Sequence, residues 1–361
     1  MGSACSSDNS NKITHTPPTP PPSPLTPSIN IDSQSIVTNE DDTQSIYEIQ
    51  PASNVVTHVV IEDSLGVTDT DTNEIIKWKS TIPIHRYHWW PMKDTDSYSL
   101  YNNLYADDGG LDKYDTLMCT NSKEYQKTHH YRSKDSTASD ANWAGFCDKA
   151  TSLSCLYEYP KRQVKVNYKN KEIEFSTFNI EALMIIASDN AINRHRGLFM
   201  GERNNSDHPT KNNKSEPLPS ELLEMLESLS YCNTSFAMDI DSGSAVWNYS
   251  FDSFSVRSYS SCPMPHEKPK DGATQYLHFI IDSTAYPDKA QHLWGYINKS
   301  KDTHKTTEEW ITSDHPDFIW KNYPKKSAWK GKCNINPNVN AGYVYKIYQQ
   351  SLTDGNDILY L

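Results

Sequence analysis

The residue of this sequence best suited to chemistry is Cys147, which stands in the stretch Asn142–Ala150. Gly145 permits a tight turn, and the residues after it predict an apolar helix whose first turn contains the cysteine. A helix N-terminus favours negative charge, so it lowers the pKa of a thiol and raises the thiolate fraction. Backbone amides of the same turn can donate to the oxyanion of an acyl intermediate. The pattern predicts a cysteine nucleophile for acyl transfer; the alternative is a buried structural thiol.

A cysteine nucleophile also needs a base and a group that orients the base. Asp239 stands on a predicted strand, where it can orient the base, be the base, or be an ordinary carboxylate at a turn. Asn248 can supply an orienting amide; its alternatives are a turn residue and the first position of a glycosylation sequon. Trp143 and Trp247 are the candidates for substrate binding, with core packing beside the site as the alternative for Trp247.

The base itself is the least defined part of this site. His315 precedes a proline late in the chain and is taken as the candidate, while His278 lies in the middle of a predicted strand. A structural role is the favoured alternative for both, because sequence does not show which side chains reach Cys147. The other histidines stand in polar surroundings and are expected to face solvent: His85, His88, His129, His130, His195, His208 and His266.

These residues must be positioned by a mixture of helices and strands. Hydrophobic periodicity and turn signals predict helices over 147–157, 180–192 (with Asn179 as N-cap) and 221–229 (opened by Pro219 and Ser220). They predict strands over 164–168, 173–175, 236–241, 245–249, 254–259, 276–282 and 293–297, with a turn at 169–171 and a loop over 201–217. Residues 88–91 and 109–115 are expected to flank a polar, turn-prone entry region. Helices followed by a run of antiparallel strands indicate an α+β fold.

Composition excludes several classes of function. The 361 residues carry a net charge of −12, and no basic cluster is present to bind nucleic acid. No apolar run approaches the ~20 residues that span a bilayer. The seven cysteines include no spacing typical of a zinc site, so no metal site is expected from them. Disulfides in an exported protein remain open for Cys119, Cys155, Cys232, Cys262 and Cys333, with one cysteine left unpaired.

The N-terminal residues 1–54 are predicted to form a disordered tether rich in Pro, Ser and Thr. Gly2 fits an N-myristoylation pattern, and Cys5 is either a palmitoylation site or the lipidated cysteine of a bacterial lipoprotein. An arbitrary start is the remaining alternative. The catalytic region is placed at 75–350 and a C-terminal tail at 351–361. A secreted or cell-surface location follows, with membrane contact only through a lipid anchor.

Four motifs occur in the order found in the transglutaminase elicitor family, which is known from plant-pathogenic oomycetes and Vibrio. The stretch from Trp143 to Ala150 resembles its nucleophile segment, and the later segments resemble its hairpin and helix, its elicitor segment and a late aromatic motif. The matching residues are Glu158–Pro160, 164–167, Ile173–Phe175 and Asn179–Leu183; Phe236–Asp239 with Val246–Asn248; and Glu309–Trp310 with His315–Trp320.

The resemblance implies a papain-like cysteine-enzyme core and protein–glutamine γ-glutamyltransferase (transglutaminase) activity. Cys147 would form an acyl-enzyme from a protein-bound Gln with release of ammonia, and a Lys or other primary amine would then attack. The partners would be proteins that bear Gln and Lys, and the family's activity is calcium-dependent. Oligomeric state is not indicated.

One departure weakens the implied site, because the His expected ahead of the Asp239 strand is absent from Pro219–Leu229. Two alternatives therefore stay open. One is a cysteine peptidase or glutamine deamidase on the same site, in which water resolves the acyl-enzyme. The other is a non-enzymatic surface or adhesion protein that has lost the base.

Overall fold

The structure is a computed structural model, and it describes residues 72–92, 104–131, 144–193, 198–203, 216–241, 245–264, 270–299, 306–313, 315–325, 328–333 and 335–361. All of these residues belong to one unit of the chain, residues 48–361. The predicted tether and its lipidation candidates, Gly2 and Cys5, lie outside the described residues. None of the described helices combines the length and the apolar character that crossing a membrane requires.

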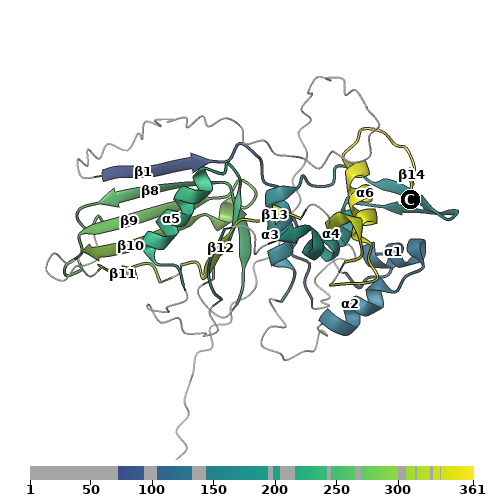
Figure 1. Cartoon of the computed structure of the whole chain (residues 1–361), viewed down its shortest axis with the longest axis horizontal. Coiled ribbons are helices and arrows are strands. Elements are labelled where there is room, and N and C mark those ends of the chain that lie inside the picture. Colours follow the sequence, from purple (N-terminus) through teal and green to yellow (C-terminus); the bar gives the residue numbers. More distant parts are fainter. Residues whose placement is uncertain are drawn as a thin grey trace, which may run out of the picture. The chain divides into compact units, whose positions relative to one another are not determined.

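The fold is α+β, as the sequence predicts, and its largest sheet has five antiparallel strands (Figure 1). Their order is β1 (Thr72–Lys79), β8 (Ser253–Tyr259), β9 (Gln275–Asp282), β10 (Gln291–Lys299) and β11 (Thr306–Trp310). Alternate side chains of these strands, such as Phe254, Val256 and Phe279, are buried on one face. Figure 1 shows α5 (Pro219–Ser230) lying across this sheet, and its Leu222 and Leu226 belong to the same core.

A second antiparallel sheet carries two of the candidate site residues. Its order is β5 (Phe199–Gly201), β12 (Phe318–Trp320), β6 (Phe236–Asp239) and β7 (Asn248–Phe251). The predicted strands over 236–241 and 245–249 are therefore present with shifted bounds. In the β6–β7 pair, Asp239 lies directly opposite Asn248. Residues nine positions apart in the sequence thus become cross-strand neighbours.

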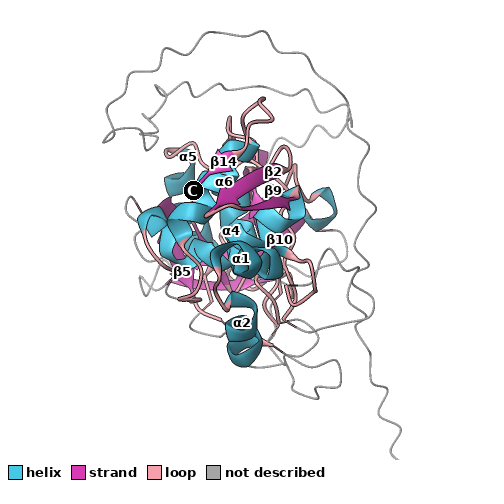
Figure 2. Cartoon of the chain, turned by 90° about the vertical axis from the view of Figure 1, so that its right-hand side faces the viewer, coloured by secondary structure: helices cyan, strands magenta, loops and turns pink. Residues whose placement is uncertain are grey.

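The helical part of the fold surrounds α4 (Thr177–Ala191), which is apolar on all sides and buried. It packs against α1 (Gly110–Met118), α3 (Cys147–Leu156) and α6 (Ala341–Ser351). Figure 2 shows α4 between α1 and α6. Beside these helices, β2 (Val164–Tyr168) and β3 (Lys171–Phe175) form the predicted hairpin, whose turn residues Lys169 and Asn170 both have positive φ, as tight hairpin turns require.

The N-cap predicted for α4 is wrong by three residues. Ser176 is the N-cap, and its hydroxyl accepts from the backbone N–H of Asn179 at 3.2 Å. The Asn179 side chain in turn accepts from the backbone N–H of Ser176 at 3.0 Å, which completes a capping box. Ser and Asn both favour caps, so the sequence alone did not fix which of the two precedes the helix.

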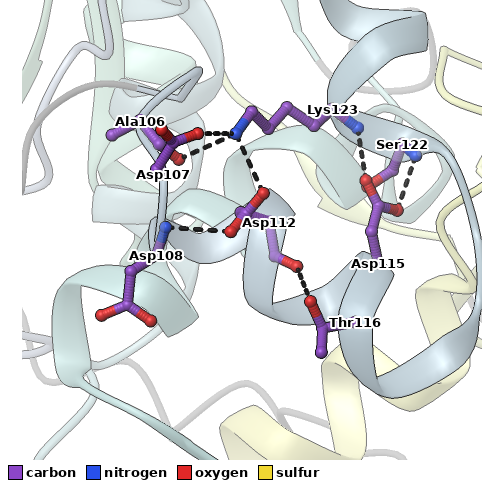
Figure 3. A network of polar contacts seen from close by, with 8 residues as sticks. All are labelled: Ala106, Asp107, Asp108, Asp112, Asp115, Thr116, Ser122 and Lys123. Atoms are coloured by element: carbon purple, nitrogen blue, oxygen red, sulfur yellow. Dashed lines mark hydrogen bonds and ion pairs between the residues drawn. The ribbon is translucent and has the colours of Figure 1, made fainter.

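Residues 109–115, expected to border a turn-prone entry region, contain the start of α1. Asp115 near the end of α1 caps α2 (Ser122–His130): its carboxylate accepts from the backbone N–H groups of Ser122 at 2.6 Å and Lys123 at 2.8 Å (Figure 3). The Lys123 ammonium lies between the carboxylates of Asp107 and Asp112, at 2.7 and 2.9 Å. A lysine thus neutralises the acidic cluster in which α1 begins.

The remaining described elements are short or lie near the C-terminus. They are β4 (Ile192–Asn193), β13 (Tyr323–Pro324), β14 (Leu359–Tyr360) and the 3-10 turns η3 (Pro287–Lys289) and η4 (Ala328–Lys330). Residues 351–361, expected as a tail, include β14, which pairs in parallel with β2. The expected loop over 201–217 falls largely on residues that are not described.

We predict that Asp115→Ala destabilises the protein by ~1–2 kcal/mol, because two N–H groups at the start of α2 lose their acceptor. Thermal or urea unfolding measures the change. Asp107→Ala is the matched control: it removes an exposed partner of Lys123 and leaves the cap in place. Equal losses in the two variants would contradict a capping role for Asp115.

Candidate functional site

Cys147 is the first residue of α3, and the two residues before it are fixed by the segment Trp89–Pro91. The backbone N–H of Phe146 donates to Trp89 O at 2.7 Å, and Pro91 and Gly145 form an antiparallel β-bridge. A Cβ at position 145 would overlap the Trp89 ring, so only glycine fits there. The helix start predicted from the sequence is confirmed, but the tight approach to Trp89 could not be foreseen.

The thiol of Cys147 meets β7. The Asn248 side chain donates from Nδ2 to Cys147 Sγ at 3.3 Å, and the thiol lies 3.6 Å from the carbonyl oxygen of Val246. Cys147 is only 8% exposed and Asn248 is buried. Two residues that are 101 positions apart in the sequence are thereby brought into direct contact. The burial of Asn248 also contradicts its alternative role as a glycosylation site.

Helix α3 is attached to β7 by polar contacts, not by the apolar surface that the sequence analysis assumed. Thr151 donates from its hydroxyl to Asn248 O at 2.9 Å, and the hydroxyls of Ser154 and Ser250 lie 2.7 Å apart. On another side of the helix, Asn322 donates to the Ser152 hydroxyl. Small hydroxyl side chains let the helix approach the strand closely, and each finds a partner there.

Asp239 lies behind Asn248 and is fully buried. Its Oδ1 accepts from the backbone N–H of Trp247 at 2.7 Å and, more weakly, from that of Asp241 at 3.4 Å. The carboxyl therefore fixes the chain just before Asn248. Structure and sequence analysis agree in bringing Cys147, Asn248 and Asp239 to one place.

Burial dominates the electrostatics of this site. Desolvation raises the pKa of the Cys147 thiol to about 11, and the nearby carboxylate of Asp148 raises it further, against the hydrogen bonds from Asn248. Desolvation likewise raises the pKa of Asp239 to about 8. The lowered thiol pKa expected at a helix N-terminus is not found, because loss of water outweighs the favourable field of the helix.

Two acceptor atoms of the site have no protein partner among the described residues. These are Asp239 Oδ2 and Asn248 Oδ1, and both belong to buried side chains. A buried acceptor without a donor costs free energy, so such atoms mark a place where a donor group from a ligand or substrate fits.

Two tryptophans pack together next to the residues that contact the thiol. The rings of Trp89 and Trp247 lie edge to face with their centroids 5.7 Å apart, and both side chains are partly buried. Trp247, predicted to bind substrate, directly precedes Asn248, while Trp143 lies outside the described residues. Trp89, which the motifs do not include, contacts Gly145 two residues before Cys147.

The structure places His315 elsewhere. Its Nε2 lies 2.7 Å from Glu216 Oε2, and the side chains of His315 and Glu216 are both buried. The His315 ring stacks on Trp310. His278 stacks on Trp294 at 3.9 Å between centroids, in the five-stranded sheet. Within the described part of the chain, no imidazole contacts the Cys147 sulfur. The prediction of His315 as a base for Cys147 therefore lacks a contact.

The expectation that the other histidines face solvent is wrong for three of them, His85, His88 and His130, which are partly buried. Desolvation lowers the pKa of His85 and His88, that of His88 to about 4. His130 packs its ring against Phe146, with centroids 6.1 Å apart, whereas His129 is exposed. His195, His208 and His266 lie outside the described residues.

No group of three or more His, Cys, Asp or Glu side chains within the described ranges is arranged to hold a metal ion. The acidic residues around α1 enclose the Lys123 ammonium instead (Figure 3). No disulfide joins any two of the six cysteines that the structure describes.

Compared with known proteins, the chain matches no family model, no curated protein and no solved structure. The resemblance to the transglutaminase elicitor family therefore stays a hypothesis based on the motifs. The contacts among Cys147, Asn248 and Asp239 are the structural basis for a functional proposal.

We predict that Asp239→Asn flattens the pH dependence of stability. Because burial raises the pKa of this carboxyl from 3.8 to about 8, its stabilising effect is full below pH 3.8 and is lost as the pH rises through about 8. Thermal unfolding between about pH 5 and pH 9 should show the wild type losing up to a few kcal/mol more than the variant. The exposed Asp288→Asn is the control, and an unchanged pH profile in Asp239→Asn would contradict the buried, protonated carboxyl.

Proposed function

We propose that this protein is a transglutaminase-type acyltransferase with a papain-like core, in which Cys147 forms an acyl-enzyme from a protein-bound Gln. The observation that carries the proposal is the contact between the Asn248 carboxamide and Cys147 Sγ at 3.3 Å. The sequence motifs point to both residues independently of this contact. A helix led by Cys147, with Asp239 and Asn248 on the antiparallel strands that follow, is the arrangement expected of a papain-like core.

In the proposed reaction, Cys147 Sγ attacks the carboxamide carbon of Gln. The thiol proton goes to the leaving nitrogen, which departs as ammonia, and a thioester remains. A primary amine then attacks the thioester, loses a proton, and regenerates the thiol as the isopeptide bond forms. Asn248 Oδ1 supplies an acceptor for the N–H groups of the Gln carboxamide and the incoming amine, and Asp239 Oδ2 supplies a second acceptor once its carboxyl is ionised.

Asp239 is the group proposed to take up the proton, since no imidazole contacts the sulfur among the described residues. Its charge is close enough to raise the pKa of the Cys147 thiol. Transfer from a thiol with a pKa of about 11 to a carboxylate with a pKa of about 8 is uphill by ~4 kcal/mol, a modest part of an enzymatic barrier. The ionised carboxylate predominates only above about pH 8, so the activity should rise with pH.

A second candidate function is a binding protein that has lost catalysis. The raised pKa of Cys147 favours it, because little thiolate is present near neutral pH. Peptidase or deamidase chemistry would use the same acyl-enzyme, with water in place of the amine, and no feature of the described residues favours either.

The test measures incorporation of a fluorescent primary amine into a Gln-rich protein, together with ammonia release, with and without calcium. We predict labelling that rises with pH up to about pH 8, is abolished in Cys147→Ala, and falls at least ~100-fold in Asp239→Asn, the scale of a lost acid–base group. His315→Gln is the matched control: activity per folded molecule should not change, because its imidazole pairs with Glu216.

Each other outcome has a distinct meaning. Ammonia release without labelling would identify a deamidase, and loss of activity in His315→Gln alone would restore that residue as the base. Absence of both labelling and ammonia release in the folded wild type, with and without calcium, would replace the proposal by the binding protein.

A further inference from the structure

A second buried carboxyl, which the proposed reaction does not use, lies on α4. Glu181 is 1% exposed and sits among the apolar side chains of that helix. Its Oε1 accepts a hydrogen bond from the backbone N–H of His88, and its Oε2 accepts one from the Tyr159 hydroxyl at 2.9 Å. No cation contacts this carboxyl in the described part of the chain.

The residue bound by Glu181 begins the segment that rests on the N-terminus of α3. Phe146 donates its backbone N–H to Trp89 O at 2.7 Å and lies within 3.3 Å of Trp90 O. Met92 N–H donates to Ala144 O at 3.0 Å. A short series of contacts therefore connects Glu181 to Cys147. The carboxyl accepts from the His88 amide, and Trp89, the next residue, accepts from the amide of Phe146, which precedes Cys147.

The backbone of this segment has a conformation that is unfavourable without contacts from its surroundings. Trp90 has a φ of +43°, in the left-handed region that bulky residues rarely adopt. Such a conformation persists only where the surroundings enforce it. Besides the backbone bonds to residues 144–146, the enforcing contacts include the bond from His88 to Glu181 and, one residue earlier, the bond that the Tyr286 hydroxyl donates to Tyr87 O at 2.9 Å.

We propose that Glu181 is a positioning residue for Cys147: its contact with His88 holds the strained Trp89–Trp90 segment against the start of α3, and ionisation of Glu181 releases that segment and exposes the thiol. The inference rests on the proposed function only in taking Cys147 as the reactive group. It does not depend on the acyl chemistry.

The direction of the switch follows from burial. Desolvation raises the pKa of Glu181 from 4.5 to about 7, despite the hydrogen bonds, the largest from the His88 amide, that favour its charge. The closed arrangement thus prefers the neutral acid. Its advantage is full below pH 4.5, declines as the pH rises, and is lost above about pH 7. Rising pH therefore favours an open arrangement in which the carboxylate reaches water.

The groups that face Glu181 do not titrate over the same range. Burial raises the pKa values of Tyr87, Tyr159 and Tyr286, so these hydroxyls stay neutral. Burial and the nearby Arg86 lower the pKa of His88 to about 4. The Arg86 guanidinium carbon lies 5.4 Å from the centroid of the Tyr286 ring.

The experiment measures carbamidomethylation of Cys147 by iodoacetamide on the full chain, using mass spectrometry of the Cys147 peptide. Exposed Cys119 in the same molecule is the internal reference, which cancels the intrinsic rise of thiolate with pH. In the wild type, the ratio of Cys147 to Cys119 labelling should rise by up to about tenfold per pH unit from about pH 5, and level off above about pH 7.

Three variants decide the outcome, each checked for folding by circular dichroism. Glu181→Gln keeps an acceptor for His88 without a charge, so its ratio should stay low and independent of pH. Glu181→Ala removes the contact, so its ratio should be high already at about pH 5. Tyr159→Phe removes a bond that favours the carboxylate, so levelling off should occur at higher pH.

A pH-dependent rise that persists in Glu181→Gln would overturn the proposal, and so would full protection of Cys147 in Glu181→Ala. Because labelling needs no substrate, its result is independent of amine incorporation. A wild type that shows the switch but no transamidation would refute the acyltransferase and leave the positioning role intact.

Discussion

Helix α3 buries polar side chains against β7, and every one of these side chains must find a partner there. Cys147, Thr151 and Ser154 follow one another at intervals of about one turn, and they contact Asn248 Nδ2, Asn248 O and Ser250 Oγ respectively. An unsatisfied hydroxyl at this interface would cost ~1–3 kcal/mol, so the register of helix on strand is strongly determined. Asp239 fixes the same strand from behind through the Trp247 amide. The position of the thiol is thus determined by the hydrogen bonds that the polar side chains of α3 must make with β7.

The same burial that fixes the geometry suppresses charge. Cys147, Asp239 and Glu181 all have pKa values displaced toward the neutral form by desolvation. Near neutral pH the resting site therefore holds a thiol and a protonated Asp239. A reaction that needs a thiolate must draw its proton acceptor from a group already close by, or begin with an opening that readmits water. The proposed roles of Asp239 and Glu181 correspond to these two requirements.

The sequence was most informative where local chemistry decides structure. The Gly145 turn, the start of α3, the β2–β3 hairpin and α5 follow from residue type and spacing, and the structure shows all of them. It was less informative where partners are distant. Ser176 and Asn179 are equivalent as caps until the helix entry is seen, and the sequence gives no sign that Leu111 and Tyr114 of α1 belong to the core. The lowered pKa predicted for Cys147 is wrong, because a helix N-terminus can be recognised in the sequence, whereas the burial that raises the pKa cannot.

The site combined residues that the sequence identified with others that it could not. The motifs point to Cys147, Asn248 and Asp239, whereas His315, the candidate base from the late motif, belongs with Glu216 in a separate buried pair. Trp89 and Glu181 carried no signal, because a tryptophan before a proline and a glutamate in an apolar helix have many possible roles. Their importance lies in the backbone: Trp89 contributes a carbonyl and a ring to the start of α3, and Glu181 binds the amide just before it. Trp90, next to Trp89, has a strained backbone. Strain favours movement of a segment once the contact that restrains it is weakened. In the proposal, the contact between Glu181 and His88 is that restraint, so it can hold or release the segment that covers the thiol.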